Sequence, residues 1–423
     1  MSSNRPLSYL IWESVLQNID ANKRFFLFQQ CPALRQAENS LPLKVDTLLL
    51  DGSVFSVNDA VYKIGIVRKY HNDSETPHGV KKLNEEGGSA VECDVYGFSE
   101  HLRNDGIFLG FVKEKAEELR EVRKGKAILL GLPDTPEKSR KLEMLTKFIN
   151  ETEEVIYRAS LRQNKLPPPF NHYLQVKIST KYGSQEGERV GYIRTISDAS
   201  DSLFKAVFQK RSNIRIKKLE IESSELLERN LAALNSNLKV RIRNMTIKWG
   251  VFMENIQNVL DYENHPLETI EISRDIFVRQ ENILYHQIVN SAQKLIITVS
   301  EWDLAELINK RVHVRKTSDL KNKIIALVNN WLENGRPIGS CFSFEIHNKL
   351  DAKNTIKEIE EAQRNKIQLY VNETPKQFRN CLVLWMTIDS NLYIYLEKRE
   401  KSKMNWDLKL NVLPTESQIP PNA

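Results

Sequence analysis

The sequence contains no long apolar run. No segment of it reaches the roughly 18 uninterrupted apolar residues that a bilayer-spanning helix needs, and the mean hydropathy is −0.45. The polar opening Met1-Ser2-Ser3-Asn4-Arg5-Pro6 leads into no stretch of signal-peptide character. We therefore expect a soluble protein of the cytoplasm or the nucleus, without a membrane partner.

Closely spaced cysteines are also missing. The four cysteines are widely separated, at Cys31, Cys93, Cys341 and Cys381. Disulfide frameworks and zinc sites depend on ligands that recur within a few residues of one another. The pattern therefore predicts reduced and mostly buried thiols.

One segment combines side chains that could bind a metal ion. His71, Asp73, Glu75 and His78 bring imidazoles and carboxylates together, but their spacing matches no standard helix or finger geometry. A solvated loop accounts for this composition better. We expect no metal and no other cofactor.

The motifs of common enzyme classes are absent from the sequence. No glycine-rich loop has the phosphate-binding or dinucleotide-binding pattern, and no Gly-x-Ser-x-Gly elbow occurs. We therefore expect a protein that is not an enzyme. The competing hypothesis is a catalytic site assembled from distant residues, which would need a deep pocket with titratable groups such as His71 and His78.

The charge is nearly balanced, with 61 Lys+Arg against 55 Asp+Glu and a formal net charge of +6. The most basic run, 210–218, contains alternating isoleucines and predicts a strand with solvated cations. We expect no nucleic-acid partner. A nucleic-acid binder would need a contiguous basic face that includes Arg211, Arg215, Lys217 and Arg241.

Three short helices are expected in the first 43 residues. Apolar side chains recur at helical spacing over 6–19, Asp20 is suited to cap a second helix, and Pro32 begins a third. Three helices of this size bury little surface alone, so they need a neighbouring domain or a partner.

Residues 44–192 are expected to mix strands and helices. The segments 45–50, 54–57 and 61–67 predict a small antiparallel meander, followed by a loop over 71–88. Thr135 and Pro136 predict the start of a long amphipathic helix over about 136–161.

Residues 193–413 alternate strand-like and helix-like segments. The expected strands begin about every 25 residues, a period typical of βα repeats of the leucine-rich-repeat kind. Spacing alone does not determine curvature, so an α+β sandwich is the alternative. We expect strands at 214–221, 238–247, 267–272, 294–299, 341–346, 366–371 and 381–388, a closing hairpin through 389–391, and a disordered tail at 414–423.

The opening contains Pro6-Leu7-Ser8-Tyr9-Leu10, Val15-Leu16-Gln17-Asn18-Ile19-Asp20, Arg24 and Cys31-Pro32-Ala33-Leu34. In these residues the opening resembles an F-box. Further segments, among them Leu41-Pro42-Leu43, Asp94-Val95-Tyr96-Gly97-Phe98 and Leu203-Phe204-Lys205-Ala206-Val207-Phe208, are similar to a nematode-expanded family of uncharacterised F-box-like proteins. The resemblance implies a degenerate F-box followed by a leucine-rich-repeat-like region.

This resemblance leads to an expected architecture and function. The fold would be α+β or α/β, with a three-helix F-box-like module at 1–43, a mixed αβ region at 44–192 and an irregular βα repeat array at 193–413. The chain would be a substrate-recognition subunit of a cullin-type ubiquitin ligase, with a substrate on the concave strand face. The alternative is a scaffold whose helical cap is purely structural. The residues implied to contact the ligase adaptor are Pro6, Leu7, Leu16, Ile19 and Phe28.

Overall fold

The computed structural model divides the chain into two compact units, which are described separately. Unit 1 comprises Met1–Gly52 and Val207–Ala423, and unit 2 comprises Ser53–Ala206. The units do not follow the expected boundaries at 43/44 and 192/193, because the opening helices belong with the C-terminal residues. The structure describes residues 9–72, 74, 76–208, 211, 213–222, 240–248, 253–257, 260–261, 263–273, 283, 286–298, 303–315, 320–346, 348–369, 381–399 and 406–415.

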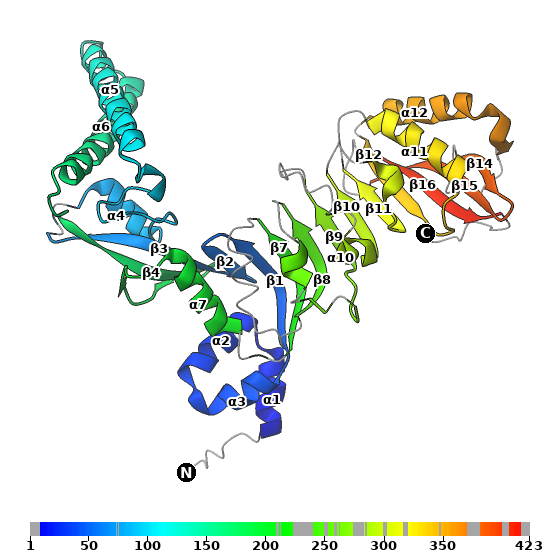
Figure 1. The fold of residues 1–423 in the computed structure, drawn as a ribbon, viewed down its shortest axis with the longest axis horizontal. Coiled ribbons are helices and arrows are strands. Elements are labelled where there is room, and N and C mark those ends of the chain that lie inside the picture. The colour runs from blue at the N-terminus through cyan, green and yellow to red at the C-terminus, as the bar shows by residue number, and fades with distance from the viewer. Residues whose placement is uncertain are drawn as a thin grey trace. The chain divides into compact units, whose positions relative to one another are not determined.

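Unit 1 contains the opening helices and a mixed sheet (Figure 1). Its helices are α1 (Tyr9–Asn18), α2 (Ala21–Gln30), η1 (Pro32–Leu34), α3 (Arg35–Ser40), α9 (Met253–Gln257), α10 (Gln287–Ser291), η5 (Leu304–Glu306), α11 (Leu320–Asn334), α12 (Lys349–Ala362) and η6 (Arg364–Lys366). Its strands are β1 (Leu43–Asp51), β7 (Ile214–Ile221), β8 (Val240–Ile247), β9 (Thr269–Ile272), β10 (Lys294–Ile297), β11 (Arg311–Val314), β12 (Cys341–Ile346), β13 (Ile367–Leu369), β14 (Leu382–Thr387), β15 (Ser390–Lys398) and β16 (Trp406–Pro414).

The strands of unit 1 form a parallel ladder that ends in antiparallel strands. The order β1-β7-β8-β9-β10-β11-β12 is parallel at every step. After β12 the order continues antiparallel through β16, β15, β14 and β13. The large sheet is therefore mixed, and the expected hairpin through 389–391 is confirmed by the antiparallel pairing of β14 with β15.

The same spacing of buried residues recurs along the parallel ladder. From β1 to β11, a residue in the strand or up to two positions before it is buried, and so are the third and the fifth residue after it, so that successive strands stack equivalent side chains. Asn309 is the polar member of the series, and its Nδ2 donates to the backbone oxygen of Val289 at 2.8 Å, which satisfies the buried amide. The triplets are Val45/Leu48/Leu50, Ile216/Leu219/Ile221, Ile242/Met245/Ile247, Leu267/Ile270/Ile272, Ala292/Leu295/Ile297 and Asn309/Val312/Val314.

The opening helices pack on one another and on residues of unit 1 near position 208. Leu16 is fully buried in a cluster with Ala37 and Leu41. The carboxylate of Asp20 accepts from the backbone N–H of Asn22 and caps α2 as predicted. The ring of Phe25 meets that of Phe208 edge to face, with centroids 5.8 Å apart. These contacts supply the neighbour that three short helices require.

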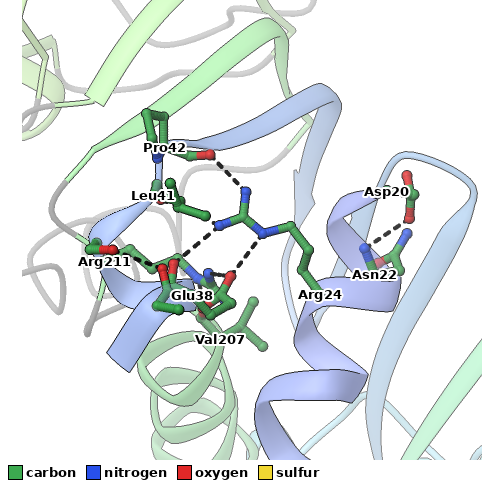
Figure 2. A network of polar contacts seen from close by, with 10 residues as sticks. Asp20, Asn22, Arg24, Glu38, Leu41, Pro42, Val207 and Arg211 are labelled. Carbon is green, nitrogen blue, oxygen red and sulfur yellow. Dashed lines mark hydrogen bonds and ion pairs between the residues drawn. The ribbon is translucent and has the colours of Figure 1, made fainter. Parts of the chain in front are cut away.

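A buried ionic network joins the opening helices to the start of the parallel ladder (Figure 2). Arg24 on α2 approaches Glu38 on α3 with 2.9 Å between Nε and Oε1, and it donates to the backbone oxygen of Pro42 at 2.7 Å. Arg211, just before β7, reaches the same carboxylate oxygen from the other side and donates from Nε to the oxygen of Val207 at 2.9 Å. All three charged side chains are at most 4 % exposed. One carboxylate therefore holds two guanidinium groups.

Unit 2 consists of an antiparallel sheet and long helices. Its strands are β2 (Val54–Val57), β3 (Ala60–Tyr70), β4 (Phe170–Thr180), β5 (Gly183–Glu186) and β6 (Val190–Gly191), and its helices are α4 (His78–Glu85), η3 (Glu100–Leu102), α5 (Asp105–Leu130), α6 (Pro136–Gln163) and most of α7 (Ile196–Phe208). The sheet is built on the long β3–β4 pair. The side chain of Thr135 caps α6 by accepting from the N–H of Lys138, so the long predicted helix is confirmed.

Several predicted elements differ from the structure. The expected loop over 71–88 contains α4, whose single buried apolar residue, Val80, gives too weak a periodic signal. Within the expected meander, β2 and β3 pair antiparallel as predicted, and β1 has a parallel partner, β7, that was not predicted. Strands β4, β11 and β16 and helix α5 were not predicted. Nearly all of the tail expected at 414–423 lies outside the described residues.

We predict that Glu38→Gln destabilises unit 1 by about 3–5 kcal/mol, because it leaves two buried guanidinium groups without an anion. The measurement is the midpoint of urea unfolding. The control is Glu361→Gln, which removes an exposed carboxylate 3.8 Å from Lys357 and should cost less than about 0.5 kcal/mol. Equal midpoints for the two variants would contradict the role assigned to Glu38.

Candidate binding face on the parallel ladder

The parallel ladder presents an outward face, which we define as the strand side chains that alternate with the buried triplets. Because the strands pair in register, these side chains form rows that cross neighbouring strands. The first row is Lys44, Arg215 and Arg241. The second row is Thr47, Lys218, Asn244 and Thr269. The third row is Leu49, Glu220, Thr246, Glu271, Ile296, His313 and Ser343.

The outward face is hollowed over β1, β7, β8 and β9. The depression has a volume of about 350 Å³ and is lined largely by polar side chains. Hydroxyl, amide, ammonium and carboxylate groups are all present there, so the depression can accept and donate hydrogen bonds. The lining residues are Asp46, Thr47, Lys217, Lys218, Asn244, Met245, Thr246, Thr269 and Glu271.

Ion pairs cross the outward face and its edges. Lys218 lies 2.6 Å from Glu220, and Arg315 lies 2.5 Å from Glu271. Exposed pairs of this kind stabilise a protein by only about 0–1 kcal/mol each. Their charges are therefore available for exchange with charges on a bound partner.

A histidine and a serine meet on β11 and β12. His313 Nδ1 lies 2.8 Å from Ser343 Oγ, and Arg399 Nη2 lies 2.8 Å from His313 Nε2. Because arginine only donates, Nε2 accepts and Nδ1 carries the proton that is donated to Ser343. A general base for a serine nucleophile would instead have to accept the proton of the serine hydroxyl. This pair therefore orders the sheet surface and does not activate Ser343.

Burial lowers the pKa of His313 to about 4, with Arg399 and Lys294 acting in the same direction and Asp407 opposing them. The neutral imidazole is the form that accepts from Arg399. The folded state therefore resists protonation at a position where the unfolded chain binds a proton readily.

The residues implied by the F-box resemblance occupy different environments. Pro6 and Leu7 lie outside the described residues. Leu16 belongs to the core of the opening helices, and Ile19 is half-buried. Phe28 is also half-buried, and the guanidinium carbons of Arg35 and Arg211 lie 5.5 and 5.8 Å from its ring centroid. The structure therefore does not bring the described residues of this set together on one exposed surface.

Other apolar residues of the opening helices are exposed. Ile11 and Val15 lie one turn apart on α1 and are 46 % and 38 % exposed, and Phe26 on α2 is 56 % exposed. Sequence periodicity assigns all of these positions to apolar faces but does not show which face is covered. The packing of Leu16 among the opening helices determines which face is covered.

The candidate metal ligands are not assembled in the described part of the chain. His71 is exposed, His78 begins α4, and Asp73 and Glu75 lie outside the described residues. Among the residues that the structure describes, no group of three or more His, Cys, Asp or Glu side chains could hold a metal ion. No helix within these residues is both long and apolar enough to cross a membrane.

Unit 2 contains a polar cluster that sequence reasoning missed. Glu154 on α6 receives a hydrogen bond from Tyr70 at 3.1 Å and forms ion pairs with Arg68 at 3.2 Å and Arg158 at 2.7 Å. Burial raises the pKa of Tyr70 and lowers that of Arg68. The side chains come from β3 and α6, more than 80 residues apart, so no local motif signals the cluster.

His172 and Gly97 complete this cluster. Burial, together with the nearby cations Arg68 and Arg158, lowers the pKa of His172 to about 4. Gly97 has φ +78°, and a Cβ there would lie 3.0 Å from Arg158 Nη1 and 3.5 Å from His172 Nε2. Arg158 Nη1 also donates to the backbone oxygen of Gly97 at 3.0 Å. The cluster is closely packed around the glycine.

One family model matches part of this chain. It is described as a domain of unknown function, DUF3557, and it covers residues 195–348. The matched segment spans less than half of the chain and runs from the start of α7 through β12, so it contains most of the parallel ladder. No curated protein and no solved structure matches the chain.

The first row could have been found from a short repeat. A cation precedes a β-branched residue, followed by apolar residues at the third and fifth positions after it, in Lys44-Val45-Asp46-Thr47-Leu48-Leu49-Leu50, Arg215-Ile216-Lys217-Lys218-Leu219-Glu220-Ile221 and Arg241-Ile242-Arg243-Asn244-Met245-Thr246-Ile247. The first copy is separated from the others by unit 2, which conceals the period.

We predict that Gly97→Ala destabilises unit 2 by about 1–3 kcal/mol, because alanine is strained at positive φ and its Cβ crowds Arg158. The measurement is thermal unfolding followed by circular dichroism. Gly125→Ala on α5 is the control, since nothing lies within 4 Å of its added Cβ and helix propensity should stabilise the protein by about 0.5–1 kcal/mol. An unchanged unfolding temperature in Gly97→Ala would show that the packing around Gly97 is loose.

We predict that His313 contributes to acid sensitivity between pH 6.5, its ordinary pKa, and pH 4, its pKa in the folded protein. In this window the unfolded chain takes up a proton that the folded state refuses, so folding stability falls as the pH falls. His313→Gln should flatten this part of the profile of urea midpoint against pH. Parallel profiles for the parent and His313→Gln would refute the prediction.

Proposed function

We propose that this chain is a non-enzymatic protein-interaction protein that holds a partner protein on the outward face of its parallel ladder. The observation that supports this most is the recurrence of the buried triplet from β1 to β11, which leaves equivalent outward positions on each strand. Strand side chains held by a buried core are well ordered before binding, so less conformational entropy is lost when a partner is bound.

The repeat character of this region is part of the proposal. In leucine-rich-repeat-like βα units each repeat buries its apolar residues against its neighbours, and the strand face is the common binding surface. The spacing of Leu267, just before β9, and of Ile270 and Ile272 on β9 follows such a pattern. The polar and mixed-charge composition of the outward face suits a protein partner, because protein interfaces combine polar rims with complementary charges.

We further propose that the opening helices bind the adaptor subunit of a cullin-type ubiquitin ligase, which would make the chain a substrate-recognition subunit. The resemblance of the opening to an F-box supports this role. Since Leu16 forms the core of the helices, the contact is assigned to the exposed positions Ile11, Val15 and Phe26. The mechanism is bridging: one surface holds the adaptor and the outward face holds the substrate.

The alternative is a scaffold protein whose opening helices serve only as a cap. Two observations favour it, namely the burial of Leu16 and the contact of Phe28 with Arg211. Both place residues of the F-box-like pattern inside unit 1. In this alternative the outward face still binds a partner. The opening helices serve only to hold unit 1 together through the buried network of Glu38.

We predict that the full-length chain co-purifies with the ligase adaptor and that Ile11→Asp/Val15→Asp abolishes the complex. A charge on an apolar docking surface remains unpaired when it is buried, which costs several kcal/mol, on the order of 2–5. The measurement is retention of the purified adaptor on the immobilised chain.

The matched control is Ile308→Asp/Ile388→Asp, which places the same charges on side chains that are 64 % and 84 % exposed elsewhere in unit 1. Circular dichroism verifies that both variants fold. Retention by the parent and the control, with loss in the α1 variant, supports the ligase role. No retention by the parent would leave the scaffold as the better proposal.

A further inference from the structure

The first row of the outward face places three cations next to one another. Lys44 on β1 is in register with Arg215 on β7, and Arg215 is in register with Arg241 on β8. Like charges directly opposite on neighbouring strands are destabilising by a few tenths to about 1 kcal/mol. Repulsion among these three cations therefore destabilises the fold, and an anionic partner would relieve the repulsion.

The acids near this row do not neutralise it fully. Arg241 is paired with Asp261 at 3.4 Å, and that carboxylate is largely buried. Within the described part of the chain, neither Lys44 nor Arg215 has an acidic partner at ion-pair distance, and the same holds for Lys217, which follows Arg215 on the exposed side of β7. These three cations are exposed and available.

The row lies beside the depression described above. Lys217 and Lys218 line the depression, and the side chains of Asn244 and Thr269 contribute amide and hydroxyl donors to the same surface. A carboxylate accepts hydrogen bonds from all of these groups. A chain whose acidic residues lie on the row can therefore place uncharged polar groups in the depression, where the carboxylates of Asp46 and Glu271 would repel further acids.

We propose that this end of the outward face, formed by Lys44, Arg215, Lys217 and Arg241, binds an acidic, extended segment of a partner protein. The inference rests on the proposed function, since it names the class of partner for the same face. At a strand spacing of about 4.8 Å the row spans roughly 10 Å, the length of about three residues of extended chain. Two or three acidic residues close together in sequence match it.

A nucleic acid fits this surface less well. Phosphates follow one another along a strand and need a continuous track of cations. Arg211, which would extend the track, is buried and bound to Glu38. The carboxylates of Asp46 and Glu271 line the depression and would repel a phosphate backbone. A short acidic peptide can contact the row without crossing these acids.

The experiment measures binding of labelled short peptides to the full-length chain by fluorescence anisotropy, at low and at high salt. One peptide alternates glutamate with serine, a second alternates lysine with serine, and a single-stranded RNA oligonucleotide is the third probe. The acidic peptide should bind most tightly. Lys44→Gln/Arg215→Gln should weaken that binding roughly tenfold, as expected when two charge pairs are lost, and high salt should do the same.

The matched control is Lys353→Gln/Lys357→Gln, which removes two exposed cations from α12 in the same unit and should leave the affinity unchanged. Equal binding of the acidic peptide by the parent and Lys44→Gln/Arg215→Gln overturns the inference. Tighter binding of RNA that is lost in the same variant also overturns it, in favour of a nucleic-acid surface.

Adaptor retention is measured on the same proteins, so that failure of the acidic-partner proposal can be distinguished from failure of the ligase proposal. Adaptor retained by Lys44→Gln/Arg215→Gln, together with no binding of the acidic peptide by the parent, rejects the acidic partner and leaves the proposed function standing. Peptide binding without adaptor retention supports the acidic partner and rejects the ligase role.

Discussion

The parallel pairing of β1 with β7 is the constraint on which unit 1 depends. These strands are neighbours in the sheet although unit 2 lies between them in the sequence. Closing the long segment between β1 and β7 is entropically unfavourable, so stabilising contacts are needed where its two ends meet. Glu38 provides such contacts, because its carboxylate joins Arg24 of the opening helices to Arg211 at the start of β7. The opening helices therefore stabilise the pairing of β1 with β7 and are also a candidate docking module.

The buried triplets explain why equivalent side chains of neighbouring strands in the ladder lie on one face. Once Ile216, Leu219 and Ile221 are committed to the core, the residues between them must point outward, and the parallel register places each beside its counterpart on the next strand. Rows of like side chains follow from this geometry. The row of Lys44, Arg215 and Arg241 is one result, and the hydrogen-bonded pair of His313 and Ser343 is another.

Local signals predicted much of the secondary structure. The limits of β7 and β12 agree with the expected strands, and Thr135 marks the start of α6 as expected. Elements with short or weak apolar patterns were missed, among them β11, where Arg311 and His313 alternate with two valines. Helix α5 was missed although it is long, because only Phe108 and Leu119 on it are buried. Periodicity detects an element in proportion to how much of it the core covers.

The sequence by itself determined the opening helices and their caps, the long helix α6, most of the strands and the near balance of charge, because these depend on residues that are close together in the chain. Tertiary structure alone decided that Leu16 is core, that Arg211 is buried beside Glu38, and that Lys44 lies next to Arg215. The physical reason is that Leu16 is buried by its packing against Ala37 and Leu41, whereas the other two outcomes depend on contacts between segments more than 150 residues apart. Nothing in the local chemistry of β1 or β7 specifies its neighbour.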